Sequence, residues 1–428
     1  MFTNIKKFIQ NSVFFENIDN IAYIILLAVL FCSLFLQSEM IGMIALLFCA
    51  AVLFKVVFRG INYKLENYEK ALIVYFLFVT VSLFGSTLFN LSLHGYLKTL
   101  IYILFYFCAG AFFVENKRKI LPTMLFMALC ASYEAIIAIL QNLHGVDEIS
   151  GWQDMTHLNP EEVVSRAYGT LLPYNPNLLA GYLLCALSSF VYLILLALKN
   201  KKKKTALIFL GLFLLNLIAI IDTGCRGAYL GFLFFFPTLF LGLIIHVEKQ
   251  FGGLSNIKKR YKNLSIGVLA AVAAFIFTNP ALIKRFESIF ALRADSSISF
   301  RLNVYESAVR MFLDNIFLGI GVGNQNFREI YGLYMKTGYD ALGSYCVPLE
   351  IAVESGIFAL LAFLGFLFFI IKKCANVIKQ DNLDNKILCF SLILMVLAVS
   401  GHALFDTIWF RPQVQFMFWI FIATLKKN

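Results

Sequence analysis

The chain has 428 residues, of which 60% are hydrophobic and 14% are charged, and its mean hydropathy is +0.80. Soluble globular proteins are far less apolar, so the sequence predicts an all-α integral membrane protein that crosses the bilayer many times. The net charge of +11 would suit a nucleic-acid-binding protein, but the excess lies in short segments beside apolar runs, where membrane topology explains it. We therefore expect membrane lipids, and no nucleic acid, as partners.

Apolar runs near the roughly 20 residues that a bilayer core requires recur along the chain. We predict twelve spans, at residues 21–36, 40–58, 71–89, 96–114, 120–140, 177–198, 206–221, 227–246, 264–277, 347–371, 387–405 and 410–425. Some of these runs are short, so a total of eleven to thirteen spans fits the sequence. We expect a single membrane domain over residues 1–428, with a first outer loop at 141–176 and a large outer loop with short helices at 279–346.

Basic residues are divided unequally between the two predicted sides. If the N-terminus is cytoplasmic, so is the C-terminus, and 25 of the 36 Lys and Arg residues lie on the cytoplasmic side, where positive charges are retained. Of those 25 residues 22 are Lys, whereas 8 of the 11 outer ones are Arg. Arg binds phosphate and carboxylate groups in a bidentate manner, and Lys binds them only as a point charge. The outer side is therefore expected to bind an anionic partner, although outer arginines can also pair with nearby carboxylates.

The large outer loop contains a predicted helix at residues 299–314. Glu306, Arg310 and Asp314 are spaced four apart on one face of it, which favours a structural role for Arg310. Arg301 lies on another face and has no partner at this spacing, so it is the better candidate for ligand binding.

Two glycine-containing turns are predicted at outer span ends. Asp222-Thr-Gly-Cys-Arg-Gly227 joins the seventh and eighth spans and leaves Arg226 at the membrane interface, where an ionisable side chain is a candidate for function. A pair between Arg226 and Asp222 is the alternative. Gly319-Ile-Gly-Val-Gly-Asn324 superficially resembles a dinucleotide-binding motif, but Asn324 replaces the third glycine and no strand precedes it. We interpret it as a turn that presents backbone amides.

The first outer loop holds a single basic residue, Arg166, which lies where the head group of a substrate could pass. The loop ends at Asn175-Pro176. Pro suits the first turn of a helix, so we expect the sixth span to begin here with Asn175 as its cap.

These residues resemble a known family. Arg301 with Tyr305 and Ala308, followed by the Gly319–Asn324 motif and Phe327, is similar to the shared domain of O-antigen ligases and O-antigen polymerases. The turn at 222–231 resembles their arginine–glycine turn. A subfamily named for cyanobacterial inorganic-carbon transport is closer still, and its features are found at residues 166–170, 175–181, 331–335, 345–356 and 402–412.

The resemblance implies a GT-C-like architecture and a bacterial inner-membrane glycosyltransferase that needs neither metal nor cofactor. Such an enzyme takes a glycan from a polyprenyl-diphosphate donor and passes it to a sugar hydroxyl of a glycan or lipid acceptor. Arginines would hold the diphosphate, and the candidates in this chain are Arg166, Arg226, Arg301, Arg310 and Arg411.

The catalytic base is less clear from the resemblance. Ligases carry a histidine nine residues before the glutamate that matches Glu354, and here Tyr345 occupies that position. A tyrosine, with a pKa of about 10, is a poor base at neutral pH. His402, with Asp406 four residues further on to orient it, is the candidate replacement, and a histidine satisfied at a helix interface is the alternative. Glu350 and Glu354 are expected either to steer the acceptor or to pair with loop arginines.

Two other functions fit parts of the sequence. The name of the subfamily suggests a bicarbonate transporter or a transport accessory protein, which would need a polar site within the membrane. Lys98 and Glu134 are the deep charged candidates for that site, and we expect them to pair. A non-catalytic scaffold for envelope assembly is a weaker hypothesis. The excess of outer arginines favours the transferase.

Overall fold

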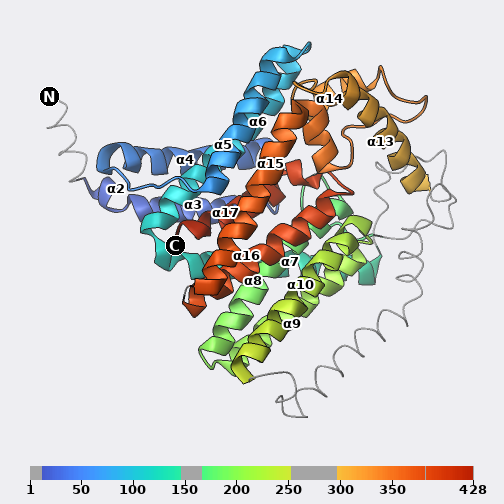
Figure 1. Ribbon diagram of the computed structural model, residues 1–428. Coiled ribbons are helices and arrows are strands. Elements are labelled where there is room, and N and C mark those ends of the chain that lie inside the picture. The colour runs from blue at the N-terminus through green and yellow to red at the C-terminus, as the bar shows by residue number, and fades with distance from the viewer. Residues whose placement is uncertain (1–11, 146–165, 252–295, 381, 428) are drawn as a thin grey trace, which may run out of the picture.

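The computed structural model describes residues 12–145, 166–251, 296–380 and 382–427, and every regular element within these ranges is a helix. The predicted all-α class is confirmed (Figure 1). In chain order the helices are α2 (Val13–Glu16), α3 (Ile18–Cys32), α4 (Ser38–Arg59), α5 (Asn67–Gly85), α6 (Phe89–Glu115), η1 (Lys117–Lys119), α7 (Ile120–His144), α8 (Pro176–Lys199), α9 (Lys203–Asp222), α10 (Arg226–Phe251), α13 (Ser296–Asp314), α14 (Asn324–Tyr331), α15 (Val347–Gln380), α16 (Leu383–Ala403), η6 (Ile408–Phe410), α17 (Pro412–Ala423) and η7 (Thr424–Lys427).

Within the described ranges, nine helices are long and apolar enough to cross a membrane: α4, α5, α6, α7 together with η1, α8, α9, α10, α15 and α16. The predicted span at 264–277 lies outside the described residues. The helices at two other predicted spans, 21–36 and 410–425, are shorter than expected. Helix α3 has 15 residues and α17 has 12. Helix α3 stops at Cys32, where the chain turns, and α17 begins only after the turn η6.

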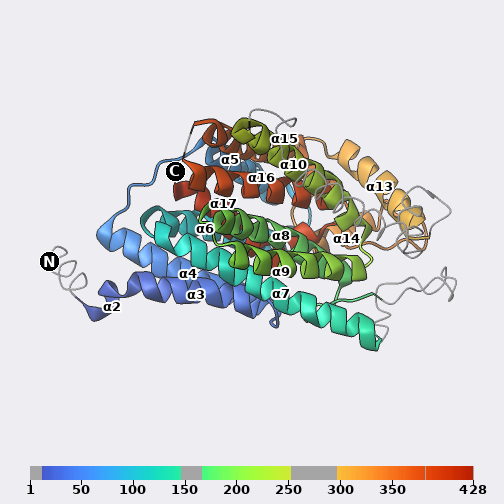
Figure 2. The ribbon, with the colours of Figure 1, turned by 90° about the horizontal axis from the view of Figure 1, so that it is seen from below.

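The two ends of the bundle differ in what they carry. Figures 1 and 2 both show the C-terminus at one end and helices α13 and α14 at the opposite end. Ion pairs at the C-terminal end join charged residues that the sequence places on the cytoplasmic side: Lys426–Glu69 (2.8 Å), Lys373–Glu66 (3.1 Å), Lys199–Asp384 (2.6 Å) and Lys55–Asp19 (2.5 Å). The alternation of the predicted spans is consistent with these contacts.

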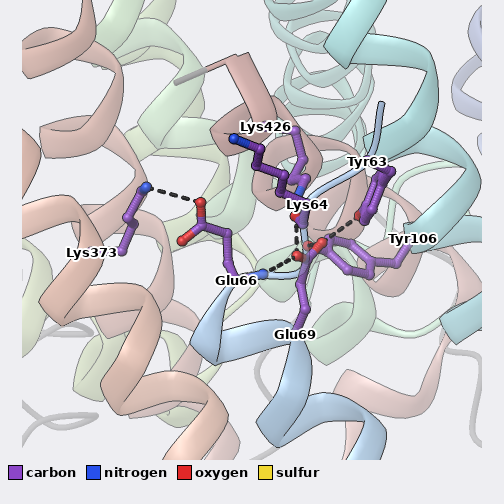
Figure 3. A network of polar contacts seen from close by, with 7 residues as sticks. All are labelled: Tyr63, Lys64, Glu66, Glu69, Tyr106, Lys373 and Lys426. Atoms are coloured by element: carbon purple, nitrogen blue, oxygen red, sulfur yellow. Dashed lines mark hydrogen bonds and ion pairs between the residues drawn. The ribbon is translucent and has the colours of Figure 1, made fainter. Parts of the chain in front are cut away.

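Helix α17 is the core of the bundle, since all of its twelve residues are buried. A polar network fixes the chain just beyond its C-terminus (Figure 3). Glu69, itself fully buried, accepts hydrogen bonds from Lys426 Nζ (2.8 Å), Tyr106 Oη (3.0 Å) and the hydroxyl of Tyr63. The amide of Glu66 also donates to Glu69 (2.7 Å), as in a helix capping box. The network therefore attaches the C-terminus to the start of α5.

Helix α15 is broken at Gly356, whose φ of 80° and ψ of 176° are not helical. The break frees backbone groups that a continuous helix would satisfy. Residues 316–323, which we call the glycine arm, pair with them. Three backbone hydrogen bonds join the arm to the break: Ile320 N to Val353 O (2.9 Å), Gly321 N to Glu354 O (3.0 Å) and Ile357 N to Ile316 O (2.8 Å). Protein groups thus satisfy the broken helix, as an apolar environment requires.

The glycines of the arm are needed for this close approach. Gly319, Gly321 and Gly323 all have positive φ, between 69° and 117°, which side chains disfavour. A Cβ at Gly319 would lie 2.4 Å from the Glu354 carbonyl, and one at Gly95 of α6 would lie 2.4 Å from the Val322 carbonyl. The predicted amide-presenting turn therefore exists, and its amides donate to α15 and, from Val322, to Ser92 of α6.

Candidate active site

Residues of the first outer loop fold back onto the bundle and position Arg166. Its Nε donates to the Thr223 carbonyl (2.7 Å) and its Nη2 donates to Asn177 Oδ1 (2.5 Å). The side-chain amide nitrogen of Asn177, Nδ2, in turn donates to Asp406 Oδ2 (2.7 Å). Helix α8 begins at Pro176 as predicted, and Asn175 is its cap, because the Asn175 side chain accepts a hydrogen bond from the backbone amide of Asn177 (2.8 Å). Arg166 therefore links three segments that are distant in sequence.

The turn between α9 and α10 lies against the end of α16. Cys225, 2% exposed, has its Sγ 3.4 Å from Nε2 of His402, which is 1% exposed. Burial raises the pKa of the Cys225 thiol, but the attraction of His402 outweighs burial and the net pKa is lowered. The thiols of Cys225 and Cys346 are both free.

The partner of His402 differs from the sequence prediction. The expected position of Asp406 on the same helix is wrong, because α16 ends at Ala403, and Asp406 forms no hydrogen bond with His402. Asp406 instead accepts from Asn177 and from the Thr407 amide (2.7 Å). It stays close enough to His402 for the two to interact electrostatically.

Arg301, on α13, faces two tyrosines at this end of the bundle. Its guanidinium carbon lies 5.7 Å from the ring centroid of Tyr345. Burial raises the pKa of Tyr345 to about 12, with Asp406 adding to the increase and Arg301 opposing it. Burial likewise raises the pKa of Tyr305 to about 12. Tyr345 therefore stays neutral at physiological pH, and its backbone φ of 54° is unusual for a residue with a side chain.

The two glutamates of α15 are both buried and both accept backbone amides. Glu350, 4% exposed, accepts from the Ser344 amide (2.7 Å), and Glu354, 4% exposed, accepts from the Gly323 amide of the glycine arm (3.0 Å). The two glutamates therefore accept hydrogen bonds from the loop backbone, and not from the loop arginines that were one of their expected partners. Glu350 interacts electrostatically with Asp406, which places it beside the same cluster.

Two of the five predicted arginines interact with residues outside this cluster. Arg310 pairs with Glu306 (2.6 Å) and its side chain is 59% exposed, so the expected pair is confirmed, whereas its assignment to the diphosphate stays a prediction. Asp314, the other member of the expected ladder, instead accepts from the Tyr334 hydroxyl (2.9 Å). Arg411 lies directly before α17 and interacts electrostatically with Tyr102 of α6.

The pair expected from the transport hypothesis does not form. Glu134 is fully buried and accepts hydrogen bonds from the amide (2.9 Å) and hydroxyl of Thr170, whereas the side chain of Lys98 is exposed. Glu134 therefore holds the first outer loop in place.

Asp406 is the common neighbour in the cluster that remains. It interacts electrostatically with Cys225, Tyr305, Tyr345, Glu350 and His402. Arg301 interacts with His402 as well. In the part of the chain that the structure describes, no group of three His, Cys, Asp or Glu side chains is arranged to hold a metal ion.

Comparison with known proteins identifies part of this arrangement. Residues 211–364 match the family model described as O-antigen ligase. This part of the chain is similar to an O-antigen ligase domain. The domain covers the turn with Arg226, the helix with Arg301, the glycine arm and both glutamates of α15, and it ends before His402 and Asp406. The predicted resemblance to the ligase and polymerase superfamily is confirmed, whereas the carbon-transport subfamily stays a prediction. No curated protein matches the chain.

Cys225 and Asn177 were missed as site residues. Both stood in motifs that the sequence marked, the Asp222–Gly227 turn and the Asn175–Gly181 segment. Their partners, His402 and Asp406, are 177 and 229 positions away, and hydropathy and local spacing carry no information on such contacts.

Proposed function

We propose that the protein transfers a glycan from a polyprenyl-diphosphate donor to a sugar hydroxyl of a glycan or lipid acceptor, at the outer face of a bacterial inner membrane. The O-antigen ligase domain supports transfer of ligase or polymerase type. The unequal distribution of Lys and Arg supports the orientation, with both termini in the cytoplasm.

The observation that carries the proposal is that the turn with Arg226 and the helix with Arg301 both interact with His402. Cys225, the residue before Arg226, contacts His402, and Arg301 interacts electrostatically with the same side chain. A diphosphate between the two guanidinium groups would receive bidentate hydrogen bonds. Arg166 holds the Arg226 turn from the other side, through the Thr223 carbonyl.

The chemistry follows from charge. The acceptor oxygen forms a bond to the anomeric carbon while the bond from that carbon to the diphosphate oxygen breaks. Negative charge grows on the leaving diphosphate, and fixed guanidinium groups stabilise it. The hydroxyl proton needs a base, which Tyr345 cannot supply with a pKa of about 12. We assign that role to Asp406, the carboxylate that interacts with Tyr345, Glu350 and His402.

Lysine substitutions test the role of the arginines. Arg226→Lys and Arg301→Lys keep the charge and lose the forked geometry, so each should reduce transfer by about 10²-fold or more. The assay measures release of polyprenyl diphosphate from a lipid-linked oligosaccharide in vesicles that contain the purified protein.

Arg328→Lys is the matched control, because Arg328 is 52% exposed in the same outer loop and pairs with Asp340. It should transfer at the rate of the unsubstituted protein. Unchanged transfer by Arg226→Lys and Arg301→Lys at normal abundance would refute the assignment.

A further inference from the structure

The two ring nitrogens of His402 have different surroundings. Nε2 lies 3.4 Å from the Sγ of Cys225. Nδ1 is buried and has no hydrogen-bond partner among the described residues. Buried polar atoms are nearly always paired, so an atom that is not paired requires an explanation.

The contact with Cys225 restricts where the protons of the ring can be. If the thiol keeps its proton, it donates to Nε2, and a neutral imidazole then carries its own proton on Nδ1. If the thiol proton has moved to Nε2, the ring is an imidazolium and Nδ1 is protonated again. Nδ1 is bare only if Nε2–H donates to the thiol sulfur, which is a weak acceptor, or if the pair carries a net negative charge, which burial of both side chains disfavours.

We propose that Cys225 fixes the protonation of His402 so that Nδ1 carries a proton, and that His402 is a hydrogen-bond donor to an anionic diphosphate and not a general base. The identity of the ligand rests on the proposed function. Cys225 is a positioning residue, because it acts through His402.

The surroundings of His402 support this role. The charged and titratable groups that act on it are Cys225, Asp406 and Arg301. Gly227 lets α10 approach the ring closely, because a Cβ there would lie 3.3 Å from Cε1. The ring therefore lies against the helix that begins at Arg226 and interacts electrostatically with Arg301, the two arginines proposed to bind the diphosphate.

Nuclear magnetic resonance tests the protonation directly. The chain has five histidines, so the protein can be labelled with ¹⁵N at histidine alone and studied in lipid, with the His402 signals assigned from their loss in His402→Asn. We expect Nδ1 of His402 to be protonated. Cys225→Ser keeps a donor and should preserve this state, whereas Cys225→Ala should give a mixture of both tautomers. An unprotonated Nδ1, or an unchanged spectrum in Cys225→Ala, would overturn the proposal.

Two substitutions of His402 separate a donor from a base. The amide nitrogen of Asn takes the place of Nδ1, and that of Gln takes the place of Nε2. If His402 donates through Nδ1, His402→Asn should keep transfer within about tenfold of the original, and His402→Gln should lose about 10²-fold or more. Thermal unfolding of both variants shows whether they are folded. Equal losses in two folded variants would mean that His402 is not a donor through Nδ1.

Farnesyl diphosphate serves as a soluble probe that separates this inference from the proposed function. Binding by the unsubstituted protein, weakened by Arg301→Lys and accompanied by a shift of the Nδ1 signal, supports both. Binding without any change at His402 overturns the inference and leaves the function standing. Absence of binding overturns the function, and with it the diphosphate as ligand, while the spectra still decide the protonation.

Discussion

Tyr345 shows how a single residue can occupy a predicted catalytic position and perform another task. Its ring packs against Arg301, and burial raises the pKa of its hydroxyl to about 12. We expect Tyr345→Phe to retain transfer within about threefold, because Phe keeps the ring face that attracts the guanidinium. The pH dependence between about pH 6 and about pH 9 should be unchanged, because the phenol stays neutral there.

The comparison with Tyr345→Ala completes this test. Removing the ring leaves the Arg301 side chain without its aromatic neighbour, so transfer should fall further in Tyr345→Ala than in Tyr345→Phe. Measured rates over the same pH range decide the matter. A lost ionisation in the Tyr345→Phe profile would show that the hydroxyl is catalytic after all.

Individual charged residues were predictable from the sequence to the extent that local spacing determines their partners. The Glu306–Arg310 pair follows from a separation of four residues on one helix and was predicted. The same rule placed Asp406 one turn after His402 on a single helix, and this placement was wrong, because the helix ends between them. The true partner, Cys225, comes from another helix pair and depends on how the bundle packs.

At the scale of elements, the contact between the glycine arm and α6 predicts that a Gly→Ala substitution within a helix lowers stability. Gly95→Ala should favour the helix by roughly 1 kcal/mol from propensity alone. A Cβ there would lie 2.4 Å from the Val322 carbonyl, a backbone atom that cannot rotate away. We therefore expect the substitution to lower the unfolding temperature and to reduce transfer, because the arm also donates to Glu354.

Gly211→Ala is the matched control for Gly95→Ala. Gly211 lies within helix α9 and a Cβ there would have no atom within 4 Å, so this variant should be as stable as the original or slightly more stable. Equal unfolding temperatures for the two variants would contradict the close contact of the arm with α6.

The helices were predictable as apolar runs, but the break in α15 was not. The run from Val347 to Ile371 contains Gly356 directly after Glu354 and Ser355, and it was predicted as one continuous span. Glycine occurs within many helices, so its presence does not reveal a break. The break is stable only because the glycine arm, more than thirty residues earlier in the chain, satisfies it.

The polar network at the end of α17 predicts a non-additive effect on stability. Lys426 and Glu69 are 5% and 0% exposed, so removing one charge leaves the other buried and should cost about 3–5 kcal/mol. Glu69→Gln and Lys426→Met should each be strongly destabilising, and the double variant less so than their sum. Chemical unfolding of the four proteins measures the coupling.

The more exposed pair Lys199–Asp384, at 31% and 41%, provides the comparison. Lys199→Met should cost no more than about 1 kcal/mol. If Lys426→Met proved as mild as Lys199→Met, the network of Figure 3 would not anchor the C-terminus.

At the scale of the whole molecule, lysine pairs and the candidate-site arginines lie at opposite ends of the bundle. The C-terminal end holds lysine–carboxylate pairs, including Lys426–Glu69 and Lys199–Asp384. The opposite end holds Arg166, Arg301 and the buried carboxylates of the candidate site. Retention in the cytoplasm requires only positive charge, which Lys supplies, whereas recognition of a diphosphate uses the geometry of Arg. The division therefore connects the topology of the protein to its proposed chemistry.

This division makes the orientation testable. A reporter that works only in the cytoplasm should be active when fused at Lys202, in the turn between α8 and α9 among a run of lysines. It should be inactive at Met335, which is 40% exposed beyond α14. A reporter that works only outside should give the reverse pattern, and this exchange controls for expression of each fusion. The positive charges beside Lys202 are the physical reason for the expectation. Activity of the external reporter at Lys202 would invert the protein in the membrane and place the arginine cluster in the cytoplasm, out of reach of an acceptor on the outer face.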